Sequence, residues 1–469
     1  MGTNGLSAAV GRATITPPVG MPMGGWSNAL HERSAGNDGE LTATAMVATD
    51  GDAAVVICEL DLCLLTHAQA DTMRAAIADA TGIAADAVRV TATHSHSAPV
   101  TGELTGSGWM REGMASVEPY MTMVTEQLTG AARDARNRLE PVTIGHGVGR
   151  STLAVNRRVG LPNGGMRVGH AWDRVVDHGV RVARFDSPSG RAVATIVHYS
   201  AHPTITAGGN HHIHAEYPGP VRQVVEAAVG GRCLFLQGTP GDIGPTETFV
   251  DELEPVRRLG SMLGHDAAAT ALRASADPHR QRVAQSQDPS TWLAFYEYAP
   301  PPATDPTVRV GTRTIEMPVR PDIGDAVAIR AEHAAMRADL DAALARGASP
   351  FEVRELRVKT KGLAMRAERA EVIAGRSTFP IELHGTRIGP LAFIGVPMEP
   401  FIELGQAIEA ASPFAMTLVS GYTNGYRNYL PTAAEWTRGG YEVDIAPFVP
   451  EAGQLFVDAS IALLRALAE

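Results

Sequence analysis

The chain has 469 residues, of which 44% are hydrophobic and 19% charged, and its formal net charge at pH 7 is −11. This apolar content is enough to fill a core, which excludes a disordered chain, and the absence of a basic cluster excludes nucleic acid as a partner. No run approaches the ~18 apolar residues of a membrane span, and the N-terminal residues do not resemble a secretory signal. We therefore expect a cytoplasmic protein that does not insert into a membrane and that binds a small-molecule substrate. A homo-oligomer is possible.

Short apolar runs alternate with amphipathic stretches along the chain. The runs that predict strands cover 53–60, 87–93, 192–200, 232–238, 391–396 and 415–421. Helical periodicity, with apolar residues three and four apart, covers 67–82, 117–139, 220–229, 255–275 and 452–468. This alternation predicts an α/β fold of mixed β-sheets flanked by helices.

The stretch 325–375 has a different character. It contains two charged, Ala-rich helical segments joined by the short sequence GASP, which predicts a helical hairpin inserted in the main body. The charges of this hairpin are most simply a solvated face. The preceding stretch 285–306, rich in proline and tyrosine, is expected to be a long loop.

A pair of histidines follows the predicted strand 87–93, within the sequence THSHSAP. Residues two apart in extended backbone point to the same side, so His94 and His96 are expected to project together from the carboxyl end of that strand. A single histidine there is more often a packed core or turn residue. Two at this spacing favour a metal site or a catalytic role.

A second group of histidines begins where the predicted strand 192–200 ends. His202 precedes Pro203, which cannot continue a β-ladder, so the chain must turn there. A polar cluster follows, made of His211, His212, His214 and Glu216. This cluster alone matches no specific ligand spacing, and an exposed polar loop explains it equally well.

Three further strand ends carry polar side chains. Asp242 lies in the Gly-rich turn after the predicted strand 232–238, where an aspartate most often bonds its own backbone. Glu399 follows the strand 391–396 and is placed at a helix N-cap, before Pro400 as the first helical residue. A tyrosine-rich loop follows the strand 415–421, and spacing does not select one tyrosine. Together, histidine and glutamate at strand ends favour a bound divalent ion, with zinc the best match.

The sequence resembles the catalytic domain of the neutral/alkaline (non-lysosomal) ceramidase family, a group of zinc-dependent amidohydrolases. The resemblance rests on a set of short motifs in order along nearly the whole chain: VGRATITPPVGMPMGGW, THSHSAP, VNRR, HYSAHPT, QGTPGDIGP, VPMEPF and YLPTAAEWTRGGYE. It implies one large zinc hydrolase domain over residues 1–469, with the 325–375 hairpin inside it.

The resemblance also implies roles for individual residues. The residues expected to hold zinc are His94, His202, Glu399 and Tyr429. His96 is expected to transfer a proton to the leaving amine, Arg157 and Tyr441 to stabilise the oxyanion, and Asp242 to orient a ligand histidine.

The chain departs from the family pattern in three places. Gly244 occupies the position in GDIGP where ceramidases carry a catalytic serine. We also expect the protein to lack the immunoglobulin-like domain that follows the GGYE motif in the family. The stretch HHIHAE is also richer in histidine than its counterpart, with Glu216 where an aspartate is common. These departures make ceramide itself a doubtful substrate, and they favour direct attack by water.

The leading hypothesis is therefore a zinc-dependent hydrolase that uses metal-activated water to cleave an amide, or an ester or lactone, of a small soluble molecule. A variant adds a second metal held by His212, His214, Glu216 or Asp61. Two other classes stay open: a family member that binds zinc and a ligand without turnover, and a zinc-dependent lyase.

Overall fold

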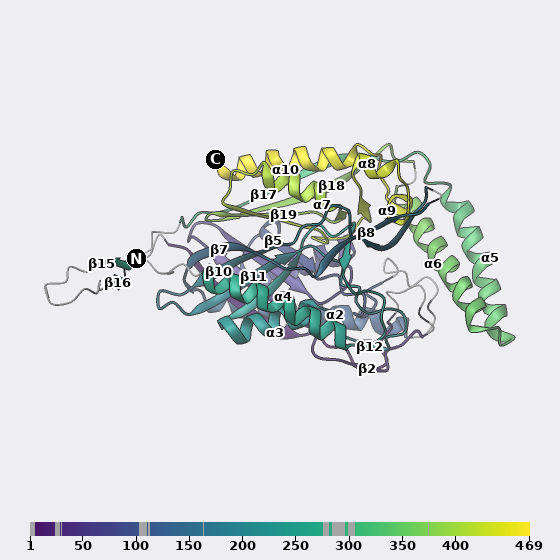
Figure 1. Ribbon diagram of the computed structural model, residues 1–469, viewed down its shortest axis with the longest axis horizontal. Coiled ribbons are helices and arrows are strands. Elements are labelled where there is room, and N and C mark those ends of the chain that lie inside the picture. The colour runs from purple at the N-terminus through teal and green to yellow at the C-terminus, as the bar shows by residue number, and fades with distance from the viewer. Residues whose placement is uncertain are drawn as a thin grey trace.

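Three β-sheets of four or five strands surround one central core in the computed structural model of the chain (Figure 1). The structure describes residues 5–23, 29, 31–102, 110, 113–162, 164–274, 281–283, 296–298, 305–373 and 375–469, so most of the expected loop at 285–306 lies outside it. The central core draws apolar side chains from strands of all three sheets, among them Val10, Ile196 and Phe393. Each sheet therefore buries one face against the other two.

The first sheet has the strand order β5-β4-β3-β1-β6. Its strands are β1 (Ser7–Thr14), β3 (Thr42–Thr49), β4 (Ala54–Leu60), β5 (Val88–Ala92) and β6 (Glu140–Pro141). Helices α1 (His67–Thr81) and α2 (Val117–Asn137) pack on its outer face. Thr66 and Gln69 form a capping box that fixes the start of α1.

The second sheet has the order β13-β11-β10-β7. Its strands are β7 (Thr143–Arg150), β10 (Gly179–Asp186), β11 (Ala192–Tyr199) and β13 (Arg232–Gln237). Helices α3 (Pro218–Val229) and α4 (Glu254–Arg273) cover it, and Pro218 begins α3 as expected. Proline suits the first turn of a helix because the missing N–H has no partner there.

The third sheet has the order β17-β18-β19-β21. Its strands are β17 (Val308–Pro318), β18 (Thr378–Ile388), β19 (Leu391–Gly395) and β21 (Met416–Ser420). Helices α7 (Ile402–Ala410) and α10 (Ala452–Ala468) cover it, and α10 runs along the top of the view in Figure 1. The N-cap expected at Glu399 is wrong: Phe401 is the N-cap of α7, and Glu399 pairs in a short strand instead.

Smaller elements complete the described residues. They are β2 (Gly36–Asn37) with β12 (His212–Ile213), β8 (Ala154–Gly160) with β9 (Met166–Ala171) and β14 (Ile243–Pro245), β15 (Gln281–Val283) with β16 (Tyr296–Tyr298), β20 (Glu399–Pro400) with β22 (Tyr429–Leu430), the helices α8 (Ala433–Trp436) and α9 (Tyr441–Ile445), and the 3-10 turns η1 (Ala85–Ala87) and η4 (Met114–Ser116).

The predicted helical hairpin is confirmed by α5 (Ala326–Ala345) and α6 (Pro350–Ile373), which project together from one end of the molecule (Figure 1). At its base, Ile329 of α5 packs with Ala370 and Ile373 of α6. Mixed sheets flanked by helices confirm the predicted fold class. No helix in the described parts of the chain is long and apolar enough to cross a membrane.

Each large sheet contains one parallel pair of strands joined through a helix. The three units are β4-α1-β5, β11-α3-β13 and β19-α7-β21. Parallel strands require such a crossover, and their carboxyl ends meet at one edge of the sheet. This arrangement provides three strand edges at which polar side chains can converge.

Close contact between β1 and α2 depends on Gly11. A Cβ atom on Gly11 would lie 2.0 Å from the carbonyl oxygen of Ala131, so Gly11→Ala must displace the helix. We expect a loss of about 1–3 kcal/mol in the free energy of unfolding, measured by urea denaturation. The control is Gly130→Ala on the exposed face of α2, where a Cβ meets nothing within 4 Å, and it should stabilise by up to about 1 kcal/mol. Equal stabilities of the two variants would contradict this packing.

Candidate metal centre

The candidate site lies at the carboxyl ends of the three βαβ units. His94 follows β5, His202 follows β11 and Glu399 follows β19. Tyr429 lies in β22, directly opposite Glu399 in the parallel pairing of β20 with β22. The positions of these four residues, which span 335 positions of the sequence, are thus set by the ends of strands.

His94 is held by the turn that ends β5. Its backbone has a positive φ of 69°, so the chain is not extended there, contrary to the expectation from alternation. The ring Nδ1 lies 2.9 Å from the carbonyl oxygen of Cys63, and the ring stacks on Tyr422 with centroids 4.0 Å apart. A carbonyl at Nδ1 favours the tautomer that carries the proton there, which leaves Nε2 free to bind a metal.

His202 is oriented in the same way by different backbone. Its Nδ1 lies 2.6 Å from the carbonyl oxygen of Pro240 and 3.2 Å from that of Ile243. Its Nε2 lies 2.8 Å from Oε2 of Glu399 and 3.2 Å from the hydroxyl of Tyr429. The Nε2 atom therefore faces the other candidate ligands.

Glu399 is a fully buried carboxylate whose oxygens both accept hydrogen bonds. Tyr422 donates to Oε2 at 3.0 Å, and Tyr426 donates to Oε1. Burial alone would raise the pKa of Glu399, but the facing His94 and His202 hold that pKa well below its usual range. The carboxylate is therefore charged at neutral pH, as a metal ligand must be.

The donor set fits a zinc ion. Nitrogen and oxygen atoms of His94, His202 and Glu399 lie within 4.8 Å of one another, and all three residues are buried. Burial lowers the pKa of His94 from 6.5 to about 3, and burial together with Arg157 lowers the pKa of His202. Both imidazoles are consequently neutral at pH 7, the form that binds metals. Two imidazoles, one carboxylate and a nearby tyrosine are suitable zinc ligands.

His96 lies beside His94, as the spacing of the pair predicts. The Nε2 atoms of the two rings are 3.1 Å apart. Burial, followed by the neighbouring His94 and His202, lowers the pKa of His96 well below 6.5. The ring is therefore neutral in the resting protein, and its burial opposes the gain of a proton.

Arg157 reaches the site from β8. Its Nη2 donates to the hydroxyl of Tyr429 at 2.9 Å, and its Nε donates to Glu442 at 2.9 Å. Glu442 also accepts from Arg158 at 2.6 Å, so one buried carboxylate holds two neighbouring arginines. A Cβ atom on Gly244 would lie 3.6 Å from Cβ of Arg157, which places the expected serine position beside this arginine.

Tyr441 and Asp242 differ in how they relate to the site. The Tyr441 ring lies edge-on to Tyr429, with centroids 5.8 Å apart, and the residue is 48% exposed.

The expected contact between Asp242 and a ligand histidine is wrong. The carboxylate of Asp242 accepts hydrogen bonds from Asn156 at 2.9 Å and from the backbone N–H of Ile402 at 2.8 Å. Backbone carbonyls orient the histidines instead, while burial raises the pKa of Asp242 to about 7.

The histidine-rich cluster does not form a second metal site in the described residues. Nδ1 of His214 accepts from the backbone N–H of Glu216 at 3.1 Å, and His212 is exposed. His211 stacks on His31, with ring centroids 3.9 Å apart. Asp61, the other residue named for a second metal, accepts from Arg222 at 2.6 Å. The converging groups of the described residues contain none of these side chains.

Sequence reasoning missed several residues that support the site. Cys63 lies with its sulfur 3.7 Å from Nδ1 of His94 and forms a second converging group with His94 and His96. Tyr422 and Tyr426 bond Glu399, but the tyrosine spacing could not select them. Glu442 directly follows Tyr441, so its place in the GGYE motif was the available signal.

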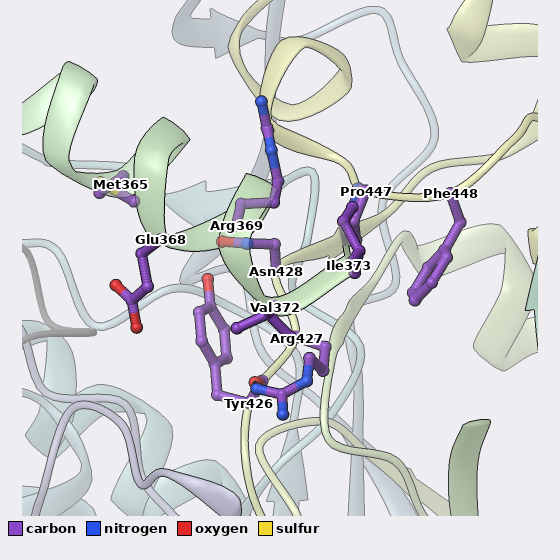
Figure 2. A pocket seen from close by; sticks show the side chains of 10 residues that line it. All are labelled: Met365, Glu368, Arg369, Val372, Ile373, Tyr426, Arg427, Asn428, Pro447 and Phe448. Carbon is purple, nitrogen blue, oxygen red and sulfur yellow. The ribbon is translucent and has the colours of Figure 1, made fainter. Parts of the chain in front are cut away.

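A small pocket adjoins the centre on the side of the hairpin. Figure 2 shows α6 contributing Met365 and Arg369 to one wall, with Tyr426 and Arg427 opposite. Because the Tyr426 hydroxyl bonds Glu399, this pocket and the metal centre share one aromatic side chain.

Comparison with known proteins gives one curated relative and two solved structures with a similar fold. No family model matches the chain. A curated relative, the neutral ceramidase of Mycobacterium tuberculosis, is 25% identical over 461 residues, which covers 88% of this chain and 69% of that protein.

Two solved structures share the fold. The neutral ceramidase of Pseudomonas aeruginosa superposes with a TM-score of 0.67 at 19% identity, covering 99% of this chain and 75% of that one. A ceramidase in complex with C2 gives a TM-score of 0.66 at 18% identity, covering 99% and 76%. The chain is thus similar in sequence to a neutral ceramidase, and it shares the fold of the two solved ceramidase structures.

Proposed function

We propose that the chain is a zinc-dependent hydrolase that cleaves an amide bond of a small soluble molecule. The observation that carries this proposal is the convergence of His94, His202 and Glu399, with the Nδ1 atom of each histidine held by a backbone carbonyl. The relatives are ceramidases by name, and ceramide is itself an amide.

His94, His202, Glu399 and Tyr429 would hold the zinc. When bound, zinc supplies Lewis-acid activation of water and of a carbonyl group. The hydroxyl of Tyr429 is already polarised by Arg157, whose guanidinium donates to it. Positive charge beside the reacting carbonyl favours the oxyanion that develops during attack.

Two other side chains serve the reaction in this proposal. Tyr441 offers a hydroxyl at the exposed side of the centre and binds the substrate carbonyl. His96, neutral in the resting protein, accepts a proton on Nε2 during attack and passes it to the leaving amine. The absence of a serine at Gly244 leaves water as the nucleophile.

Removal of the metal tests the centre itself. We expect the purified protein to contain about one zinc per chain, and a chelator to abolish amide hydrolysis until zinc is restored. His202→Ala should lose the metal, and amide hydrolysis with it, because the substitution removes one of the proposed imidazole ligands. The metal content is measured by elemental analysis.

The matched control is His265→Ala, which removes an exposed histidine of α4. It should retain full metal content and turnover. A His202→Ala protein that keeps its zinc and its rate would refute the assignment.

Tyr426 positions Glu399 without reaching the metal itself, so Tyr426→Phe separates orientation from ligation. We expect zinc affinity to fall about 10- to 100-fold, as for other hydrogen bonds that orient metal ligands. Competition with a chromogenic chelator measures this affinity.

Tyr120→Phe serves as the control. It also removes a buried hydroxyl, but this hydroxyl donates to the carbonyl oxygen of Ile15, beside the first sheet, and not to Glu399. This variant should lose stability but bind zinc normally. Equal zinc affinities for both variants and the unmodified protein would show that Tyr426 does not orient the ligand.

Arg157→Met tests the oxyanion role. We expect kcat to fall by about 10²–10³ while zinc stays bound, because the guanidinium acts on developing charge rather than on the metal. Arg258→Met, a surface arginine paired with Glu247 and Glu254, should leave kcat unchanged. A change confined to KM in Arg157→Met would assign this arginine to ground-state binding instead.

A further inference from the structure

Only part of the histidine-rich stretch is the exposed polar loop that the sequence allowed. His211 and His212 are exposed, whereas His214 and Glu216 are 2% and 1% exposed. Glu216 has a positive φ of 54°, a backbone conformation that residues other than glycine seldom adopt. The converging groups of the described residues leave out both buried side chains, so their burial needs an explanation other than metal binding.

A chain of hydrogen bonds runs from Glu216 to the turn that carries His96. Oε1 of Glu216 accepts from the hydroxyl of Thr206 at 2.7 Å and from the backbone N–H of Thr206 at 2.9 Å. The hydroxyl of Thr206 lies 2.7 Å from that of Ser97. A hydroxyl has one hydrogen to donate, and Thr206 donates its hydrogen to Glu216. Ser97 must therefore donate to Thr206, so the chain of bonds has one direction.

His214 completes the network from the same stretch. Its Nδ1 accepts from the backbone N–H of Glu216 at 3.1 Å, so the proton of the neutral ring is on Nε2. Burial lowers the pKa of His214 from 6.5 to about 4, which keeps the ring neutral at pH 7. Nε2 lies 3.4 Å from Oγ1 of Thr206 and donates to it. This hydroxyl thus donates once and accepts twice, which is its full capacity.

The stretch also holds the turn through backbone atoms. The N–H of His214 donates to the carbonyl oxygen of Ser97 at 3.2 Å, and the hydroxyl of Ser95 donates to the carbonyl oxygen of His214 at 2.8 Å. Ser95 and Ser97 are the two neighbours of His96 in the sequence, and both are fully buried. A partly satisfied network in such an interior is costly, so the bonds favour one conformation of the turn.

We propose that Thr206 and Glu216 are positioning residues for His96. Acting through Ser97, they fix the turn so that Nε2 of His96 lies 3.1 Å from Nε2 of His94. This inference rests on the proposed hydrolysis, in which His96 passes a proton to the leaving amine. The histidine-rich stretch then serves proton transfer instead of binding a second metal.

Two probes that share an acyl group isolate the proton transfer. N-butylhexanamide releases an amine that needs a proton, whereas para-nitrophenyl hexanoate releases an anion that leaves without one. We expect Thr206→Val to lower the ratio of kcat for the amide to kcat for the ester at least tenfold, with the zinc content unchanged. Thr206→Ser keeps the hydroxyl and should retain the ratio.

Variants of Glu216 test the other end of the chain of bonds. Glu216→Met removes the acceptor and should lower the same ratio, while Glu216→Gln keeps an acceptor oxygen and should preserve it. The control is Thr195→Val in β11, a fully buried residue whose hydroxyl has no hydrogen-bond partner in the parts of the chain that the structure describes. An unchanged ratio in Thr206→Val, equal losses for both probes, or a loss of zinc would each overturn the inference.

Hydrogen exchange separates this inference from the proposed hydrolysis. The backbone amides of residues 95–98 should exchange at least tenfold faster in Thr206→Val than in the unmodified protein, and at the unmodified rate in Thr195→Val. If neither probe is cleaved but exchange rises in this way, the hydrolase proposal fails and the control of the turn by Thr206 stands. If exchange does not rise, the inference is overturned even where both probes are cleaved. Circular dichroism confirms that each variant is folded.

Discussion

The buried carboxylate of Glu399 is the group on which the arrangement of the centre depends. An ionised carboxylate in an apolar interior costs several kcal/mol unless hydrogen bonds and opposite charge surround it. Tyr422 and Tyr426 donate to its two oxygens, and His202 lies 2.8 Å from one of them. These partners come from the second and third βαβ units, so the charge can be stabilised only when the sheets are assembled.

A second buried network balances charge beside this carboxylate. Arg157 and Arg158 are neighbours on β8, and both donate to Glu442, while Arg158 also donates to Glu435 at 2.7 Å. Arg174 and Arg438 also pair with Glu435, so each of the two carboxylates is shared by more than one arginine. Removal of one member would leave an unpaired charge, which costs more than the intact network contributes. The guanidinium of Arg157 is therefore held rigidly against Tyr429, as a preorganised site requires.

The sequence allowed prediction of the parts that depend on local pattern. The continuous apolar runs that became β4, β5, β11, β13, β19 and β21 lie inside the predicted ranges, because strands buried on both faces leave a clear signal. The antiparallel strands β17 and β18 were missed, since exposed and half-buried residues interrupt their apolar pattern. Glu399 was found at a strand end, but its N-cap role was wrong because the tertiary pairing of β20 with β22 overrides the local proline signal.

Contacts between distant segments account for the rest. Nothing in the sequence near His202 indicates that the carbonyl of Pro240 orients it. The orienting role was expected of Asp242 instead, from its place in a Gly-rich turn and in the family motif. The hairpin illustrates the same limit. Its alternating charges are typical of a solvated surface, yet Arg357 and Arg369 of α6 donate to backbone carbonyl oxygens of the body, so this side of the helix is turned inward. The strand ends of the three units bring the candidate ligands together in the same way, through contacts between segments that lie far apart in the sequence.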